Sequence, residues 1–126
     1  METEKILETI VKALDSKRAE DINVLKITNL TVIADYFVIA DGSSVTQTKA
    51  LADEVEYKVG ELCDGLKPRQ VQDTAGGGWI ILDYSDIVVH VFYKEQRDFY
   101  KLDKLWADGN EIDISSWITK ENALGQ

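Results

Sequence analysis

Residues 79–106, WIILDYSDIVVHVFYKEQRDFYKLDKLW, constrain the fold of this chain more than any other stretch. Within them, residues 79–84 and 87–93 are rich in β-branched and aromatic side chains, which favour β-strands. Only Ser85 and Asp86 separate the two runs. Two strands joined by two residues form a tight antiparallel hairpin. We therefore expect the rest of the chain to be arranged around a β-hairpin.

The alternation of side chains along this hairpin predicts two unlike faces. With a two-residue turn, one face is wholly apolar and consists of these cross-strand pairs: Tyr84 with Ile87, Leu82 with Val89, and Ile80 with Val91. The other face is mixed and pairs Trp79 with Phe92, Ile81 with His90, and Asp83 with Val88. The apolar face is expected to be core. The mixed face is either a second, less regular core or a docking surface.

After Lys94 the spacing of apolar residues changes from two to about 3.6, which predicts a helix. Its apolar side contains Phe99, Leu102, Leu105 and Trp106. Its opposite side contains Arg97, Lys101, Asp103 and Lys104. This pattern is typical of a surface helix that packs along one stripe.

The chain before the hairpin alternates between helical and strand patterns. Helical spacing predicts helices over residues 2–14 and 45–62, with Thr3 and either Ser43 or Ser44 as their caps. The inner side of the second helix is expected to contain Thr48, Leu51, Val55, Val59 and Leu62. Strands are predicted over residues 22–27, 36–40 and 69–72. The strand over 36–40 is apolar throughout, which is typical of a central strand buried on both faces.

The resulting order, α-β-β-α-β-β-β-α, predicts an α/β (α+β) fold with a mixed β-sheet flanked by helices. We expect one domain over residues 1–108 and a C-terminal tail over residues 109–126. The tail has one apolar patch, formed by Ile112, Ile114, Trp117 and Ile118. This patch either folds back on the domain or contacts a second copy of the chain, and the sequence leaves both alternatives open.

Charge and composition limit the classes of function. The net charge is −9, which disfavours direct binding to a nucleic-acid backbone and favours a basic partner, although acidity also serves solubility alone. The single cysteine, Cys63, excludes an internal disulfide and a multi-cysteine metal site. No apolar run approaches the roughly 20 residues that a membrane span needs. The N-terminus lacks the pattern of a secretory signal, so a cytoplasmic location without membrane contact is expected.

The segment over residues 41–44, Asp-Gly-Ser-Ser, is the first candidate for chemistry. It lies between a strand and a helix, where backbone N–H groups can hold a phosphate. It lacks the lysine of a P-loop and the carboxylate pair that a nucleotidyltransferase needs for Mg²⁺. Asp53 is isolated on a helix, whereas Asp83 and Asp86 flank the hairpin turn. A role as turn and helix cap is favoured.

The remaining candidates are also better explained by structure. His90 has no nucleophile placed with it, although Asp83 on the same face could orient its ring. Cys63 has acidic neighbours, which disfavour a reactive thiolate. The glycines of 76–78 precede a strand and not a helix, so they do not form a phosphate loop. We therefore expect no catalytic residue, no metal and no cofactor, and a binding domain that is not an enzyme.

The hairpin segment over residues 79–92, together with residues 97–100 and 102–106, closely resembles the signature of the Iojap-like ribosomal silencing factor family (RsfS). The segments over 34–44 and 19–22 are similar to further motifs of that family. These motifs extend over about residues 3 to 108 and leave the C-terminal segment out. Ser85 is a departure, since many relatives have glycine in the turn.

The resemblance implies a nucleotidyltransferase-like fold without catalytic residues. It also implies binding to the large ribosomal subunit through its fourteenth ribosomal protein, with no direct nucleic-acid contact required. Family members thereby block subunit joining and repress translation under nutrient limitation. The acidic charge of this chain suits a basic ribosomal partner.

We expect docking through the open side of the hairpin and the face of the last helix, with partner-binding residues Trp79, Tyr93, Arg97, Tyr100 and Lys104. Trp79 is either such an anchor or part of the core. Two alternatives remain open. One is a residual nucleotide-binding or nucleotidyltransferase-like enzyme activity at residues 41–44. The other is a homodimer formed through the tail around Trp117.

Overall fold

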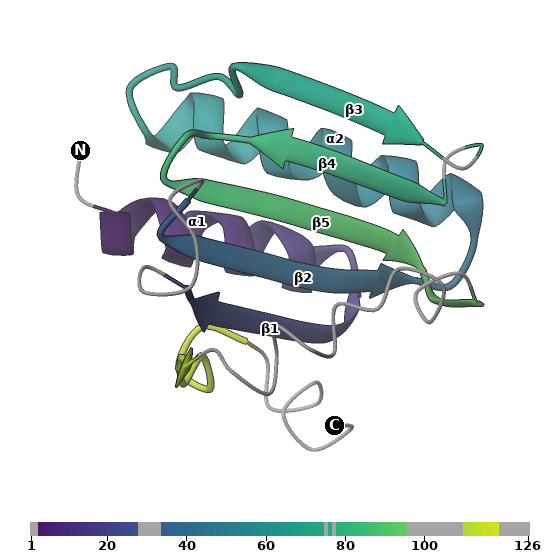
Figure 1. Ribbon diagram of the computed structural model, residues 1–126, viewed down its shortest axis with the longest axis horizontal. Helices are drawn as coiled ribbons and strands as arrows, with labels where there is room; N and C mark the ends of the chain where they lie inside the picture. The colour runs from purple at the N-terminus through teal and green to yellow at the C-terminus, as the bar shows by residue number, and fades with distance from the viewer. Residues whose placement is uncertain (1–2, 28–33, 75, 77, 96–109, 119–126) are drawn as a thin grey trace.

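The computed structural model describes residues 3–27, 34–74, 76, 78–95 and 110–118 of the chain. A six-stranded sheet has α1 and α2 together on one of its faces (Figure 1). The elements in chain order are α1 (Thr3–Ser16), β1 (Glu20–Lys26), β2 (Tyr36–Gly42), α2 (Val45–Leu62), β3 (Gln70–Thr74), β4 (Trp79–Asp83), β5 (Ile87–Tyr93) and β6 (Asn110–Glu111). The predicted mixed α+β fold is thus confirmed.

The strand order across the sheet is β3-β4-β5-β2-β1-β6. Only the pair β2 and β5 is parallel, and every other neighbouring pair is antiparallel. A parallel pair needs a crossover connection, and α2 with the β3–β4 hairpin supplies it. The central position of β2 explains its apolar sequence, because Val38, Ile39 and Ala40 are all fully buried.

The predicted register of the β4–β5 hairpin is confirmed. Trp79 pairs with Phe92 and Leu82 with Val89, and the intervening pairs follow the same register. The backbone N–H of Tyr84 donates to the carbonyl oxygen of Ile87 over 2.8 Å, which closes a two-residue turn. Ser85 has a φ of 75°, a left-handed conformation for which glycine is better suited. The carboxylate of Asp83 accepts from the N–H of Ser85 over 2.8 Å and so stabilises the turn.

The main core lies between the sheet and the two helices. It combines the apolar face of the hairpin with one stripe of each helix, including Ile10 and Leu14 of α1 and Leu51 and Val55 of α2, all of which are fully buried. A second cluster lies on the opposite face of the sheet and contains Leu25, Ile27, Ala34, Ile39, Val88 and Phe92. Part of the mixed face is therefore a second core.

Two predictions about the helix ends were wrong. Leu62 was expected on the inner side of α2, yet 55% of its surface is exposed. The helix ends there, and the next residue, Cys63, is turned inward and buried as the C-cap, so Leu62 is left at the surface. Thr3 was expected to cap α1, but it lies within the helix.

Residues 110–118 of the C-terminal segment fold back on the domain. Strand β6 pairs with the end of β1, and the N–H of Ile112 donates to the carbonyl oxygen of Val24 over 2.8 Å. Ile114 is buried in the main core, and Trp117 packs against it while remaining partly exposed. The helix predicted after Lys94 lies outside the described residues. In the part of the chain that the structure describes, no helix is long and apolar enough to cross a membrane.

Candidate functional site

The sheet face opposite α1 and α2 contains a hollow of about 330 Å³, which we call the sheet-face hollow. It crosses four neighbouring strands and is lined by Phe37 of β2, Gln70 and Gln72 of β3, Ile81 and Asp83 of β4, and Val88 and His90 of β5. Its apolar side chains are buried or half-buried, whereas the two glutamines of the edge strand are exposed. An apolar hollow with a polar rim is a common form of binding site in proteins.

Trp79 lies beside this hollow and is half-buried. Its ring stacks on that of Phe92, with centroids 5.3 Å apart and an interplanar angle of 18°. Its indole Nε1 donates a hydrogen bond to Nδ1 of His90 over 3.1 Å. Since Trp79 and His90 are diagonal neighbours across β4 and β5, the hydrogen bond holds the indole in one orientation on the sheet. Trp79 is thus a rigid aromatic group that is partly open to solvent.

His90 is 6% exposed, and its ring also contacts that of Phe37, with centroids 4.6 Å apart. Burial lowers the pKa of the His90 imidazole from 6.5 to about 4, so the ring is neutral at physiological pH. Its Nδ1 accepts from Trp79, and its Nε2 has no hydrogen-bond partner. The predicted contact with Asp83 is not formed. That carboxylate accepts instead from Arg69 over 3.0 Å and from the N–H of Ser85.

The strand-to-helix junction at residues 41–44 forms hydrogen bonds with the first turn of α2. Ser44 caps α2, as its Oγ accepts from the N–H of Gln47 over 3.0 Å, which confirms the predicted cap. The side-chain oxygen of Gln47 in turn accepts from the N–H of Ser43. Gly42 lies so close to Thr48 that an added Cβ would be 2.6 Å from Oγ1 of that residue. These contacts use the N–H groups of Ser43 and Gln47 within the protein and fit the favoured role of this segment as turn and helix cap.

Comparison with known proteins gives the family. The model of the family described as "Ribosomal silencing factor during starvation" (RsfS) matches residues 1–125. Ribosomal silencing factor RsfS of Bacillus subtilis is 37% identical over 90% of this chain and 95% of the relative. That of Halalkalibacterium halodurans is 33% identical over 94% of this chain and 100% of the relative. The chain belongs to the ribosomal silencing factor family.

A solved structure agrees with this assignment. The crystal structure of a protein from Chromobacterium violaceum superimposes with a TM-score of 0.78 at 32% identity, covering 90% of this chain and 92% of that one. The resemblance noted from the motifs is confirmed, and the family match extends beyond residue 108 into the C-terminal segment that packs on the domain.

The structure places two of the five docking residues predicted for this chain. Trp79 lies on the mixed face of the hairpin, opposite the helices, where the register places it. Tyr93 ends β5, and alternation along that strand places it on the opposite side from His90 and Phe92, so it is not brought together with Trp79. Its hydroxyl donates to Glu95, which raises the pKa of Tyr93. Arg97, Tyr100 and Lys104 lie outside the described residues.

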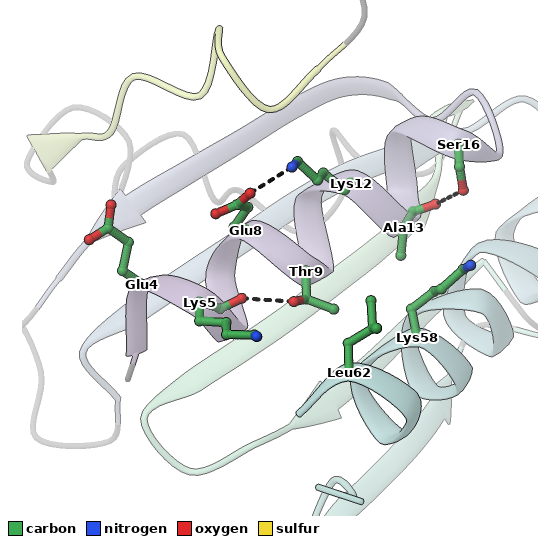
Figure 2. A pocket seen from close by; sticks show the side chains of 9 residues that line it. All are labelled: Glu4, Lys5, Glu8, Thr9, Lys12, Ala13, Ser16, Lys58 and Leu62. Atoms are coloured by element: carbon green, nitrogen blue, oxygen red, sulfur yellow. Dashed lines mark hydrogen bonds and ion pairs between the residues drawn. The ribbon is translucent and has the colours of Figure 1, made fainter. Parts of the chain in front are cut away.

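A second hollow, of about 530 Å³, lies between α1 and α2 and was not singled out from the sequence (Figure 2). It is lined by Glu4, Lys5, Glu8, Thr9, Lys12, Ala13, Ser16, Lys58 and Leu62. Lys12 pairs with Glu8 at 2.6 Å, and Thr9 Oγ1 donates to the carbonyl oxygen of Lys5. The exposed Leu62 contributes apolar surface here. Because this hollow belongs to the helix side, it is separate from the face that carries Trp79.

Metal binding has no support in the described residues. No group of three or more His, Cys, Asp or Glu side chains among residues 3–27, 34–74, 76, 78–95 and 110–118 is arranged to hold a metal ion. Cys63 is a free, buried thiol whose Sγ lies 3.7 Å from Thr9 Oγ1, consistent with the predicted packing role.

Proposed function

We propose that this chain docks on the large ribosomal subunit through the fourteenth ribosomal protein of that subunit. In this position it blocks joining of the small subunit and represses translation under nutrient limitation. Family membership supports the ribosomal target, since the relatives bear the name of ribosomal silencing factors. The proposed mechanism is steric, because a bound domain of this size occupies space that the small subunit would need.

The observation that carries the proposed docking surface is the half-buried Trp79 on the sheet face opposite the helices. Its indole is fixed by stacking on Phe92 and by the hydrogen bond to His90. Tryptophans of this kind are frequent energetic anchors of protein interfaces, because a pre-oriented ring loses little conformational entropy on binding. The adjoining sheet-face hollow offers a concave surface to the same partner.

The rest of the proposed interface extends from this face. Arg97, Tyr100 and Lys104 supply further contacts, whereas Tyr93, on the opposite side of β5 from Trp79, is left out of this interface. The net charge of −9 favours a basic ribosomal partner and raises the association rate at low salt. We also propose a cytoplasmic location, and a homodimer through the C-terminal segment as a separate arrangement.

The proposed function is tested by co-sedimentation of the purified chain with separated ribosomal subunits, with subunit joining read in the same gradient. Binding to the large subunit alone, together with fewer joined ribosomes, is the expected result. Addition of the purified fourteenth ribosomal protein as a competitor should release the chain from the subunit. Failure to bind either subunit would reject the proposal.

A matched pair of variants tests the docking surface. Trp79→Ala removes the proposed anchor, whereas Tyr57→Ala removes an aromatic ring that is 60% exposed on α2, on the helix side. Only the first should lose binding to the large subunit. Equal loss in both variants, or in neither, would reject the sheet face as the docking surface.

A further inference from the structure

Two buried side-chain polar atoms among the described residues have no hydrogen-bond partner, Tyr84 Oη and His90 Nε2. Tyr84 belongs to the main core between sheet and helices. His90 instead lines the sheet-face hollow, next to the proposed docking surface. An unpaired buried polar group is costly in a folded protein, so its retention calls for an explanation, of which a functional role is one.

The hydrogen bond from Trp79 determines which nitrogen of His90 is protonated. An indole Nε1 is a donor only, so Nδ1 of His90 must accept and carries no proton. Burial keeps the ring neutral, as its lowered pKa indicates. The single ring proton is therefore on Nε2. His90 presents an N–H donor, and Trp79 holds it in this form.

The surroundings of the hollow select the kind of acceptor. Phe37, Ile81 and Val88 form apolar walls, so a charged group would lose its hydration there. The carboxylate of Asp83 also lines the hollow and repels a second carboxylate. An uncharged carbonyl oxygen has no ionic hydration to lose and is not repelled by the carboxylate of Asp83. Such an oxygen is present on every peptide bond and on asparagine and glutamine side chains.

We propose that Nε2–H of His90 donates a hydrogen bond to an uncharged carbonyl oxygen of the ribosomal partner, presented by a protein segment that enters the sheet-face hollow. This inference rests on the proposed function. The outer wall of the hollow on the β3 side is made by Gln70 and Gln72, whose side chains are exposed. Nε2 is buried and forms no hydrogen bond within the chain, so a bond to the incoming oxygen would not replace an existing one.

Two substitutions of His90 distinguish the role of Nε2 from that of Nδ1. In His90→Gln the side-chain amide reaches the position of Nε2 and keeps a donor there. In His90→Asn the shorter amide reaches only the position of Nδ1, so it retains a polar group near Trp79 but loses the deep donor. We expect His90→Asn to weaken binding to purified large subunits about 10-fold or more, and His90→Gln to stay within about 3-fold of the unmodified chain.

Affinities measured by co-sedimentation at increasing subunit concentration distinguish the outcomes. Equal affinities for the two variants, whether both are lowered or both unchanged, overturn the inference, and so does a weaker Gln variant. In these cases the unmodified chain still binds, so the proposed function stands. Absence of binding by the unmodified chain is a different result and removes the proposed function itself.

A measurement on the unmodified chain covers the case in which a variant fails to fold. Nitrogen-15 NMR of the imidazole detects the His90 Nε2–H signal in the free chain and in its complex with the purified fourteenth ribosomal protein. We expect this proton to shift downfield and to exchange more slowly in the complex. A complex in which the Nε2–H signal keeps its free position overturns the inference.

Discussion

Trp79 and His90 form one hydrogen-bonded unit on the sheet face opposite the helices, with 3.1 Å between Nε1 of the indole and Nδ1 of the imidazole. The hydrogen bond joins the half-buried indole of Trp79 to the buried imidazole of His90. It fixes the rotamer of Trp79 and the tautomer of His90 together. A change in either residue is therefore expected to affect the other.

Truncation of Trp79 is expected to affect binding more than folding. Trp79→Ala should weaken binding to the large subunit by about 2 kcal/mol or more, because an anchor that fills a partner pocket is lost. Co-sedimentation gives the affinity, and thermal unfolding gives the stability of the same preparation. If stability collapses while the folded fraction binds normally, Trp79 is a core residue and not an anchor.

Trp79→Phe distinguishes the contribution of aromatic stacking from that of the indole hydrogen bond. Phenylalanine can still stack on Phe92 but leaves Nδ1 of His90 without a donor. The stability of this variant should fall by about 1 kcal/mol, since a partly buried acceptor is left unpaired. Denaturant unfolding measures the change. A variant as stable as the unmodified chain would show that the indole hydrogen bond contributes nothing to stability.

His90 should make the folded state less stable in acid. The pKa of its ring is about 4 in the folded chain and 6.5 in a free histidine, so between these values the unfolded chain binds a proton that the folded chain does not. Stability is therefore expected to fall as the pH drops from about 6.5 to about 4, and a pKa difference of this size corresponds to about 3 kcal/mol. Above pH 6.5 the contribution is constant.

The difference between the unmodified chain and His90→Gln isolates this effect from the many carboxylates. Denaturant unfolding of both at several pH values between 4 and 8 gives two stability curves. The curves should run parallel above about pH 6.5 and converge, or cross, below it. Parallel curves throughout the range would mean that His90 titrates normally in the folded chain.

The hairpin could be predicted residue by residue because its pairing is local. Once Ser85 and Asp86 form the turn, the period of two along each strand fixes every cross-strand pair. The parallel contact between β2 and β5 is not local, and no pattern in the sequence names the partner strand. The exposure of Leu62 depends on where α2 ends relative to the sheet, which helical spacing alone does not give.

The candidate site was predictable only in part. Alternation placed Trp79 and His90 on one mixed face, which is the signal that pointed to a docking surface. It suggested Asp83 as the group that could orient the imidazole and did not identify Trp79, because the actual contact depends on rotamers and on competing partners. The Asp83 carboxylate accepts hydrogen bonds from Arg69 and from the turn residue Ser85. The imidazole of His90 therefore pairs with the indole of Trp79 instead.

The turn offers a test of backbone conformation. Ser85 has a φ of 75°, so Ser85→Gly should relieve strain and Ser85→Val should add to it. The hydrogen bond from the backbone N–H to Asp83 is available to both variants. We expect the glycine variant to be as stable as the unmodified chain or up to about 1 kcal/mol more stable, and the valine variant to lose about 1 kcal/mol or more. Denaturant midpoints that fall in the reverse order would contradict the turn geometry.

The start of α2 should not tolerate a side chain at Gly42. A Cβ there would lie 2.6 Å from Oγ1 and 2.9 Å from the backbone N of Thr48, and the backbone atom cannot move without disturbing the helix. Gly42→Ala should therefore cost about 2 kcal/mol of stability, as overpacking does. Gly60→Ala is the matched control, since its nearest neighbour would be 4.0 Å away and alanine favours a helix. Thermal unfolding should show the first variant destabilised and the second unchanged or more stable.

The apolar side chains of residues 110–118 pack on the domain. Ile114 is 8% exposed and belongs to the main core, so Ile114→Ala should cost about 2 to 4 kcal/mol. Ser116→Ala, at an exposed position two residues away, should change stability by less than about 0.5 kcal/mol. Chemical denaturation compares the two at equal protein concentration. If Ile114→Ala were as mild as the control, the segment would not be held by the core, and its apolar residues would be available to a second copy of the chain.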